Sequence, residues 1–225
     1  MRYLSIDIET TGLDPVNDQI LSIGAIIEDT ENPLPFDEIP KFHAAIKRER
    51  IEGGLYAINM NRELLGTIND YMNARSLEEK DDIVHMTGMQ FLDEDMIVED
   101  FYYWLAEHRI VETNEVGKGG LTQISDGGTV VLPIKGTTKP THITVAGKNF
   151  ATFDKLFIER LPRWKQLFRI RQRIIDPAVL YVDWKEDDSL PGLPLCKERA
   201  GLDSTVTHNA VEDAWDVIEI LRKKY

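Results

Sequence analysis

The first fifty residues alternate between segments rich in apolar, β-branched residues and short turn-forming segments. The apolar segments 3–9, 19–29 and 41–47 are predicted to be β-strands. The connection 10–18 contains Gly12 and an Asp-Pro pair, which suit a turn. Consecutive strands joined by short connections favour an antiparallel meander.

From about residue 59 the apolar residues recur at intervals of three and four, which is typical of helices. Helices are therefore predicted over 61–74 and 94–108. The charged segment 77–82 between them is predicted to be a solvent-exposed linker. The glycine-rich segment 113–141 is predicted to be a hairpin or loop insertion.

The last third of the chain predicts strands and helices in alternation. The predicted elements are a strand at 142–148, a helix at 149–161 with Asn149 as its N-cap, a short strand at 173–176, a helix beginning at Asp176 and an amphipathic helix at 208–224. Strands followed by alternating helices and strands predict an α/β or α+β sheet domain. The 225 residues are enough for one domain with its own core, so we expect a single domain over 1–225.

Charge and composition narrow the class of protein. The chain has 39 acidic and 26 basic residues, a formal net charge of −13, which argues against broad electrostatic binding of long duplexes. A small nucleic-acid site that uses divalent metals stays compatible with this charge. The single cysteine, Cys196, excludes a disulfide within the chain and fits a reducing compartment. With no signal peptide or membrane-length apolar run in view, we expect a cytoplasmic protein without a membrane partner.

Two carboxylates interrupt the first predicted strand. Asp7 and Glu9 are two residues apart, so their side chains share one face of the strand, with Cα atoms roughly 6–7 Å apart. Burying two unpaired carboxylates there would cost several kcal/mol or shift a pKa. A hard divalent cation such as Mg²⁺ or Mn²⁺ would remove the conflict, because these ions prefer carboxylate oxygens. Hydration at a sheet end, or pairing with Lys or Arg, is the alternative.

Three further candidates lie far along the chain. Asp154 is near the apolar stripe of its predicted helix, an unusual place for a charge. Asn209 and Glu212 have capping-box spacing, which places Asp213 in the first turns of the last helix and His208 on the loop before it. A histidine on a loop end suits a general base. Taken alone, each of these residues is more often simply a surface residue.

Taken together, the segments DIETTGL, NFATFD and HNAVEDA resemble the three motifs of the DEDDh (DnaQ-like) 3′→5′ exonucleases. That family includes the proofreading subunit of bacterial replicative polymerase, RNase T and oligoribonuclease. The matching residues are Asp7, Glu9 and Thr10 in the first motif, Phe153 and Asp154 in the second, and His208, Ala210 and Asp213 in the third. The tyrosine variant of the family would have Tyr at position 209, which is Asn here, so the histidine class is favoured. The resemblance implies a ribonuclease H-like α/β fold, in which an antiparallel meander is followed by parallel strands and helices flank the mixed sheet.

The resemblance also implies a site. Two divalent ions, Mg²⁺ or Mn²⁺, would be held by Asp7, Glu9, Asp154 and Asp213. His208 would take the proton of the attacking water. The turn formed by Thr10, Thr11, Gly12 and Leu13 would receive the 3′-terminal nucleotide, with Gly12 permitting close approach. For Gly12 and Leu13, a role as simple turn residues stays open.

The activity implied is release of nucleoside 5′-monophosphates from single-stranded 3′ ends. DNA is favoured only because many relatives trim DNA; RNA ends or short oligoribonucleotides are the alternative. A non-catalytic ribonuclease H-like module that binds a partner is a third hypothesis. Whether the protein acts alone, as a homodimer or with a polymerase complex stays open.

Two features depart from the resemblance or extend it. Many relatives have a His-Gly-Ile-Thr-like element after the third strand, where this chain has EGGLYAINMNRELL. The locally basic stretch 160–173, with Trp164 and Phe168 interleaved, predicts either a phosphate-binding and base-stacking patch or a solvated face with buried aromatics.

Overall fold

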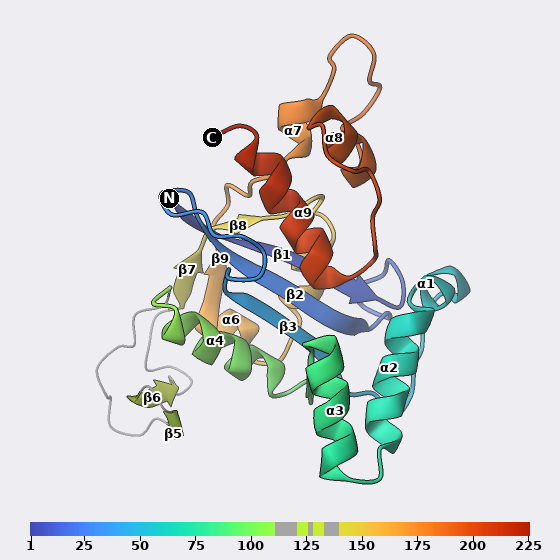
Figure 1. Cartoon of the computed structure of the whole chain (residues 1–225), viewed down its shortest axis with the longest axis vertical. Coiled ribbons are helices and arrows are strands. Elements are labelled where there is room, and N and C mark those ends of the chain that lie inside the picture. Colours follow the sequence, from blue (N-terminus) through green and yellow to red (C-terminus); the bar gives the residue numbers. More distant parts are fainter. Residues whose placement is uncertain (111–120, 126–127, 133–139) are drawn as a thin grey trace.

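The computed structural model of this chain describes residues 1–110, 121–125, 128–132 and 140–225, with side chains described over 1–110 and 140–225. Its centre is a five-stranded sheet in the order β4-β3-β2-β1-β8 (Figure 1). The strands are β1 (Arg2–Thr10), β2 (Ile20–Asp29), β3 (Lys41–Ile46), β4 (Gln90–Leu92) and β8 (Val145–Ala146).

The sheet is mixed. β1 pairs with β2 and β2 with β3, both antiparallel, which confirms the predicted meander. At the edges, β4 is parallel to β3 and β8 is parallel to β1. The predicted α/β fold, with antiparallel strands first and parallel strands later, is confirmed.

Alternation along β1 determines which helices cover each face of the sheet. Leu4, Ile6 and Ile8 join the main core with residues of α4 (Ile97–Glu107) and α5 (Asp154–Ile158). The helix α6 (Trp164–Leu167) belongs to the same layer. Tyr3 points to the opposite face, where it packs with the C-terminal helix α9 (Ala210–Arg222) (Figure 1). Odd-numbered residues of β1 therefore face α9.

The remaining helices form two groups. α1 (Leu55–Met60), α2 (Arg62–Asn73) and α3 (Leu77–Thr87) stand together at one end of the sheet (Figure 1). α7 (Ala178–Tyr181) and α8 (Leu193–Arg199) pack beside α9, and the buried Cys196 belongs to that cluster. Within the described residues, no helix is long and apolar enough to cross a membrane.

The predicted linker at 77–82 is wrong, because this segment lies in α3. The Ser76 hydroxyl accepts a hydrogen bond from the Glu79 N–H (3.1 Å), and the Glu79 carboxylate accepts one from the Arg75 N–H (2.6 Å). This Ser-x-x-Glu arrangement satisfies N–H groups at the start of the helix. The capping signal, rather than the run of charge, determines the local structure.

The predicted helix at 149–161 is also wrong at its start. Asn149 is not an N-cap; its φ of 59° is left-handed, and the helix begins only at Asp154. The Asn149 carbonyl instead accepts from the N–H groups of Thr152 and Phe153, both at 3.2 Å, in a turn that precedes α5. Asn tolerates this backbone conformation better than most residues, so the same residue type suits a cap and a left-handed turn.

The predicted strand at 142–148 is divided between two sheets. β7 (Thr141–Ile143) pairs in parallel with β9 (Phe168–Ile170), whereas β8 joins the main sheet. The predicted strand at 173–176 is reduced to an isolated bridge at Ile175. The next helix starts at Ala178 with Pro177 as its N-cap, one residue later than predicted, and the Asp176 carboxylate accepts from the Ala178 N–H at 2.9 Å.

Much of the predicted insertion at 113–141 lies outside the described residues. Within it, β5 (Leu121–Ser125) and β6 (Gly128–Leu132) pair antiparallel. In the basic stretch, Trp164 and Phe168 are buried in the core, so base stacking by these two aromatics is excluded and the interpretation as buried packing is correct.

Candidate active site

The first two carboxylates of the candidate site come from β1, in the middle of the sheet. Asp7 and Glu9 lie on the face of β1 that α9 crosses, opposite Gly24 and Ser22 of β2. Glu9 is buried and Asp7 is half-buried. The strand pairing continues to Thr10, with a register shift after Glu9 that ends the regular ladder beside the site.

A third carboxylate reaches β1 from the other half of the chain. Asp154 is the first residue of α5 and only 3% of its surface is exposed. Its Oδ1 accepts a hydrogen bond from the Ile8 N–H at 3.2 Å. This bond holds Asp154 at the backbone segment between Asp7 and Glu9.

The fourth carboxylate is positioned by α9. Asn209 caps this helix, as predicted, with its Oδ1 accepting from the N–H groups of Val211 (3.1 Å) and Glu212 (3.3 Å). The first turn of α9 lies directly on β2: a Cβ added at Gly24 would stand 2.2 Å from the Ala210 carbonyl carbon. Only glycine permits this contact, which places the buried Asp213 over the end of β1.

All four carboxylates have raised pKa values, and burial is the largest cause for each. Burial, followed by the charges of the other three carboxylates, raises the pKa of Asp7 well above its usual range. Burial and the charge of Asp213 raise the pKa of Glu9 to about 8. Burial raises the pKa of Asp154 to about 7, and burial and the charge of Asp216 raise that of Asp213 to about 7. The cluster therefore lacks positive charge.

One side chain that could supply this charge, Lys197, is engaged with other groups. Lys197 lowers the pKa of Asp213, but its ammonium group donates to the Asp216 carboxylate (2.6 Å) and to the Thr205 carbonyl (2.5 Å). The Oδ1 atom of Asp213 is buried without a hydrogen-bond partner among the described residues. An all-carboxylate donor set with an orphaned buried oxygen fits a hard divalent cation such as Mg²⁺ or Mn²⁺.

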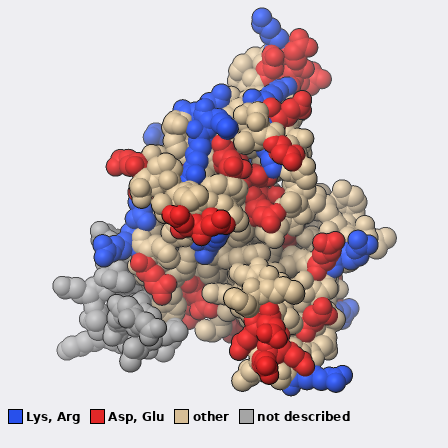
Figure 2. Space-filling view, in the orientation of Figure 1, with Lys and Arg blue, Asp and Glu red and all other residues tan. Residues whose placement is uncertain are grey.

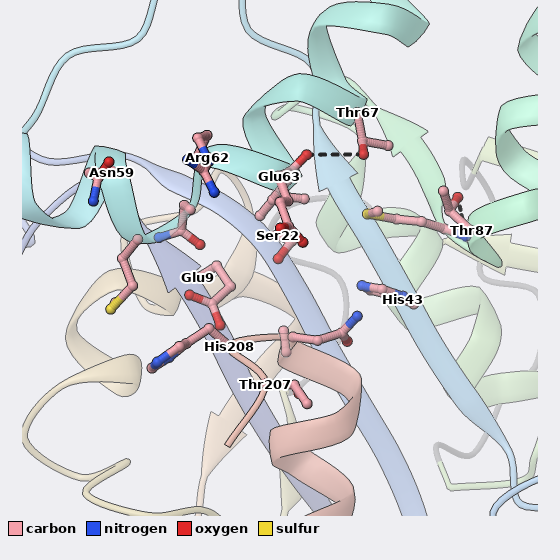
Figure 3. Close-up of a pocket in the computed structure, with 16 residues that line it drawn as sticks. Glu9, Ser22, His43, Asn59, Arg62, Glu63, Thr67, Thr87, Thr207 and His208 are labelled. Atoms are coloured by element: carbon pink, nitrogen blue, oxygen red, sulfur yellow. Dashed lines mark hydrogen bonds between the residues drawn. The ribbon is translucent and has the colours of Figure 1, made fainter. Parts of the chain in front are cut away.

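His208 lies at the open side of the cluster. Single ligand atoms of Glu9, His208 and Asp213 lie within 4.8 Å of one another. His208 is exposed, and its φ of 54° belongs to the left-handed region, which is uncommon outside glycine. Figure 3 shows Glu9 and His208 side by side at one end of a pocket. The structure thus brings the predicted histidine beside the predicted carboxylates.

The predicted nucleotide-binding turn follows β1 directly. The Thr10 hydroxyl donates to the Gly12 carbonyl (2.7 Å), and the Thr11 hydroxyl accepts from the Gln19 N–H (2.9 Å). Both threonine side chains are therefore used within the turn, whereas Leu13 is 83% exposed. Of the four residues predicted here, Leu13 alone presents a free side chain, and the other three shape the backbone.

The pocket beside Glu9 and His208 has a volume of about 410 Å³ and extends towards α2 (Figure 3). Asn61 and His43 are among the lining residues that were not predicted as site residues. Asn61 is buried between α1 and α2, and His43 on β3 has a pKa lowered to about 4 by burial. His43 shares the sheet face of Asp7, because Gly24 pairs with both residues, so strand register could have identified it. For Asn61, the only signal in the sequence is its position just before a helical pattern.

A mixed sheet flanked by helices, with carboxylates from its first strand, a later helix and the last helix, agrees with the predicted ribonuclease H-like fold. Residues 4–62 match the family model described as exonuclease, the RNase T family. No curated protein matches the chain at a significant level of sequence similarity.

Three solved structures that share this fold are described as nucleases. Exonuclease I of E. coli in complex with a dT13 oligonucleotide is 16% identical, with a TM-score of 0.51 over 100% of this chain and 40% of its own. A moderately thermophilic exonuclease I from Methylocaldum szegediense is 17% identical, with a TM-score of 0.52 over 99% of this chain and 40% of its own. Cell-death related nuclease 4 is 12% identical, with a TM-score of 0.53 over 99% of this chain and 62% of its own.

This chain thus spans about two fifths of the exonuclease I chains that it matches. At these identities the structural likeness concerns the fold, and the family match concerns the segment that carries Asp7 and Glu9. Together they confirm the predicted resemblance to the DnaQ-like exonucleases.

Proposed function

We propose that this protein is a metal-dependent 3′→5′ exonuclease that releases nucleoside 5′-monophosphates from single-stranded nucleic acid. The observation that carries the proposal is the convergence of four carboxylates, from β1, α5 and α9, beside one exposed histidine and an open pocket. A module that only binds a partner would have no use for four carboxylates whose pKa values are raised by burial. We favour DNA, because the E. coli exonuclease I that shares the fold is described with bound dT13.

The proposed ligands of two divalent ions are Asp7, Glu9, Asp154 and Asp213. When bound by these residues, such ions would supply activation of a water molecule and stabilisation of the charge on the reacting oxygens. The chain's own contribution is to hold the carboxylates ready: the Ile8 N–H orients Asp154, and the capped first turn of α9 orients Asp213. His208 stands at the solvent side, where it can take the proton of the attacking water and release it.

The substrate strand would approach over an apolar rim. Leu13, Leu55 and Tyr56 are each more than 80% exposed. The Gly54 N–H donates to the Thr11 carbonyl at 2.8 Å, which ties the start of α1 to the turn that carries Leu13. Exposed apolar and aromatic side chains beside the site can stack on bases irrespective of sequence.

The surface charge of the protein is consistent with a short contact to the end of a nucleic-acid strand. On the face shown in Figure 2, acidic side chains gather over α3 and around α9, and the Lys and Arg side chains form one group near the C-terminal end of the chain and otherwise lie singly. With a net charge of −13, the protein gains little from the phosphates of a long duplex. We therefore expect recognition to depend on the last nucleotides of a single strand.

Degradation of labelled strands tests the proposal. Single-stranded DNA and RNA of one sequence, labelled at the 5′ end, are incubated with the protein in Mg²⁺, in Mn²⁺ or in EDTA. Stepwise shortening that requires metal supports the exonuclease, and the faster polymer identifies the substrate. Asp7→Asn and Asp213→Asn should abolish shortening, whereas Asp188→Asn, on an exposed loop, should not. Cleavage at internal positions, or of neither polymer, would contradict the proposal.

A further inference from the structure

Asn61 occupies an unusual place between α1 and α2. Only 3% of its surface is exposed, and it lines the same pocket as Glu9 and His208. Its amide nitrogen donates to the carbonyl oxygens of Thr10 (3.1 Å) and Ala57 (3.2 Å). Its amide oxygen is buried and has no hydrogen-bond partner among the described residues.

The orientation of this amide is determined by its neighbours. The Thr10 and Ala57 carbonyls can only accept hydrogen bonds, so the nitrogen of Asn61 must face them. Rotating the amide by half a turn would place its oxygen against two other oxygens. The Asn61 Oδ1 atom is therefore a fixed acceptor, and buried acceptors in native proteins are paired with few exceptions.

The surroundings define which ligand group could pair with it. The Glu9 carboxylate, whose pKa is raised by burial and lowered in part by a hydrogen bond from the Asn61 side chain, and the Thr10 carbonyl both act as acceptors towards this amide, whereas the neighbouring Arg62 is exposed. A phosphate group of the strand has no proton to donate to these acceptors. A sugar hydroxyl does, and it is attached close to the bond that the carboxylates would attack.

We propose that the Asn61 amide oxygen accepts a hydrogen bond from a sugar hydroxyl of the 3′-terminal nucleotide. This inference rests on the proposed exonuclease function and makes Asn61 a positioning residue. Its amide nitrogen holds the Thr10 carbonyl, so one side chain would couple the nucleotide to the segment after Glu9. An internal nucleotide has no free 3′ hydroxyl, so the contact would favour chain ends.

The test combines one protein change with one substrate change. kcat/KM is measured for the wild type and Asn61→Ala on strands that differ only in the last sugar: 2′-deoxy with a 3′ hydroxyl, 2′,3′-dideoxy, and 3′-deoxy with a 2′ hydroxyl. The wild type should prefer a hydroxyl-bearing end over the dideoxy end, and Asn61→Ala should reduce that preference about tenfold, the scale of one hydrogen bond to a buried acceptor. If Asn61→Ala lowers the preference for the 3′-hydroxyl strand over the dideoxy strand, the bound hydroxyl is the 3′ one. If it lowers the preference for the 2′-hydroxyl strand, the bound hydroxyl is the 2′ one.

A structural role alone gives a different result. Distortion of the Thr10 turn would slow all strands equally, and an unchanged preference in Asn61→Ala would overturn the inference, as would a wild type without preference for any hydroxyl. Asn59→Ala, which changes an exposed residue of the same pocket, is the matched control and should keep the preference.

Two further provisions keep the test decisive. If circular dichroism shows that Asn61→Ala is unfolded, Asn61→Thr replaces it, since its hydroxyl can still donate to the Ala57 carbonyl. A wild type that shortens none of the strands would instead contradict the exonuclease function itself.

Discussion

Replacing Glu9 with glutamine should stabilise the metal-free protein and abolish its hydrolytic activity. Glu9 is 6% exposed, and burial together with Asp213 raises its pKa from 4.5 to about 8. The folded protein therefore binds a proton that the unfolded chain releases between these two pH values. The stability linked to Glu9 is complete below pH 4.5 and is lost as the pH rises towards 8.

The size of this pH effect on stability follows from the pKa shift of Glu9. One pKa unit corresponds to about 1.4 kcal/mol, so the free energy of unfolding should fall by about 2.5 kcal/mol between about pH 5 and about pH 7. Glu9→Gln removes this dependence because its amide does not ionise. Near pH 7 the metal-free variant should melt about 5–10 °C above the metal-free wild type, at the roughly 2–4 °C per kcal/mol typical of chains of this size.

Urea unfolding followed by circular dichroism, in EDTA over a series of pH values, measures both quantities. Glu63→Gln is the matched control, because Glu63 lines the same pocket but is exposed on α2. Adding Mg²⁺ at a hundred times its Kd should stabilise the wild type by about 2.7 kcal/mol and Glu9→Gln by much less. A Glu9→Gln variant that is less stable than the wild type at about pH 7, or that keeps the full pH dependence, would refute the reasoning.

Three other changes probe separate parts of the site. His208→Ala should slow hydrolysis by about 10²–10⁴-fold while Mg²⁺ still raises the melting temperature, and unchanged turnover would remove its role as a base. Gly24→Ala should destabilise the protein by about 1–3 kcal/mol in urea unfolding, because the new Cβ would collide with the Ala210 backbone; wild-type stability would contradict the close contact of α9 with β2. Tyr56→Ala should weaken binding of single strands by about 1–3 kcal/mol in fluorescence anisotropy, and an unchanged Kd would exclude base stacking there.

Local patterns along the chain were sufficient for much of the architecture. The apolar, β-branched segments of β1, β2 and β3 and the short turns between them predict the antiparallel meander, because consecutive strands joined by short connections pair with each other. The Asn209 cap predicts where α9 begins, because side-chain capping is a contact over two or three residues. Where local signals compete, as at Ser76 and Asn149, the prediction failed.

The sequence by itself determined which residues form the candidate site, because the spacing of Asp7 and Glu9 and the order of the three motifs can be read along the chain. Only the tertiary structure decided how they meet, since Asp154 reaches the Ile8 N–H across 146 residues. It also revealed Asn61, whose significance depends on an amide turned by two carbonyls so that its oxygen is left without a partner. Periodicity reports the neighbours within a strand or helix, whereas such contacts arise when the apolar faces of distant segments pack together.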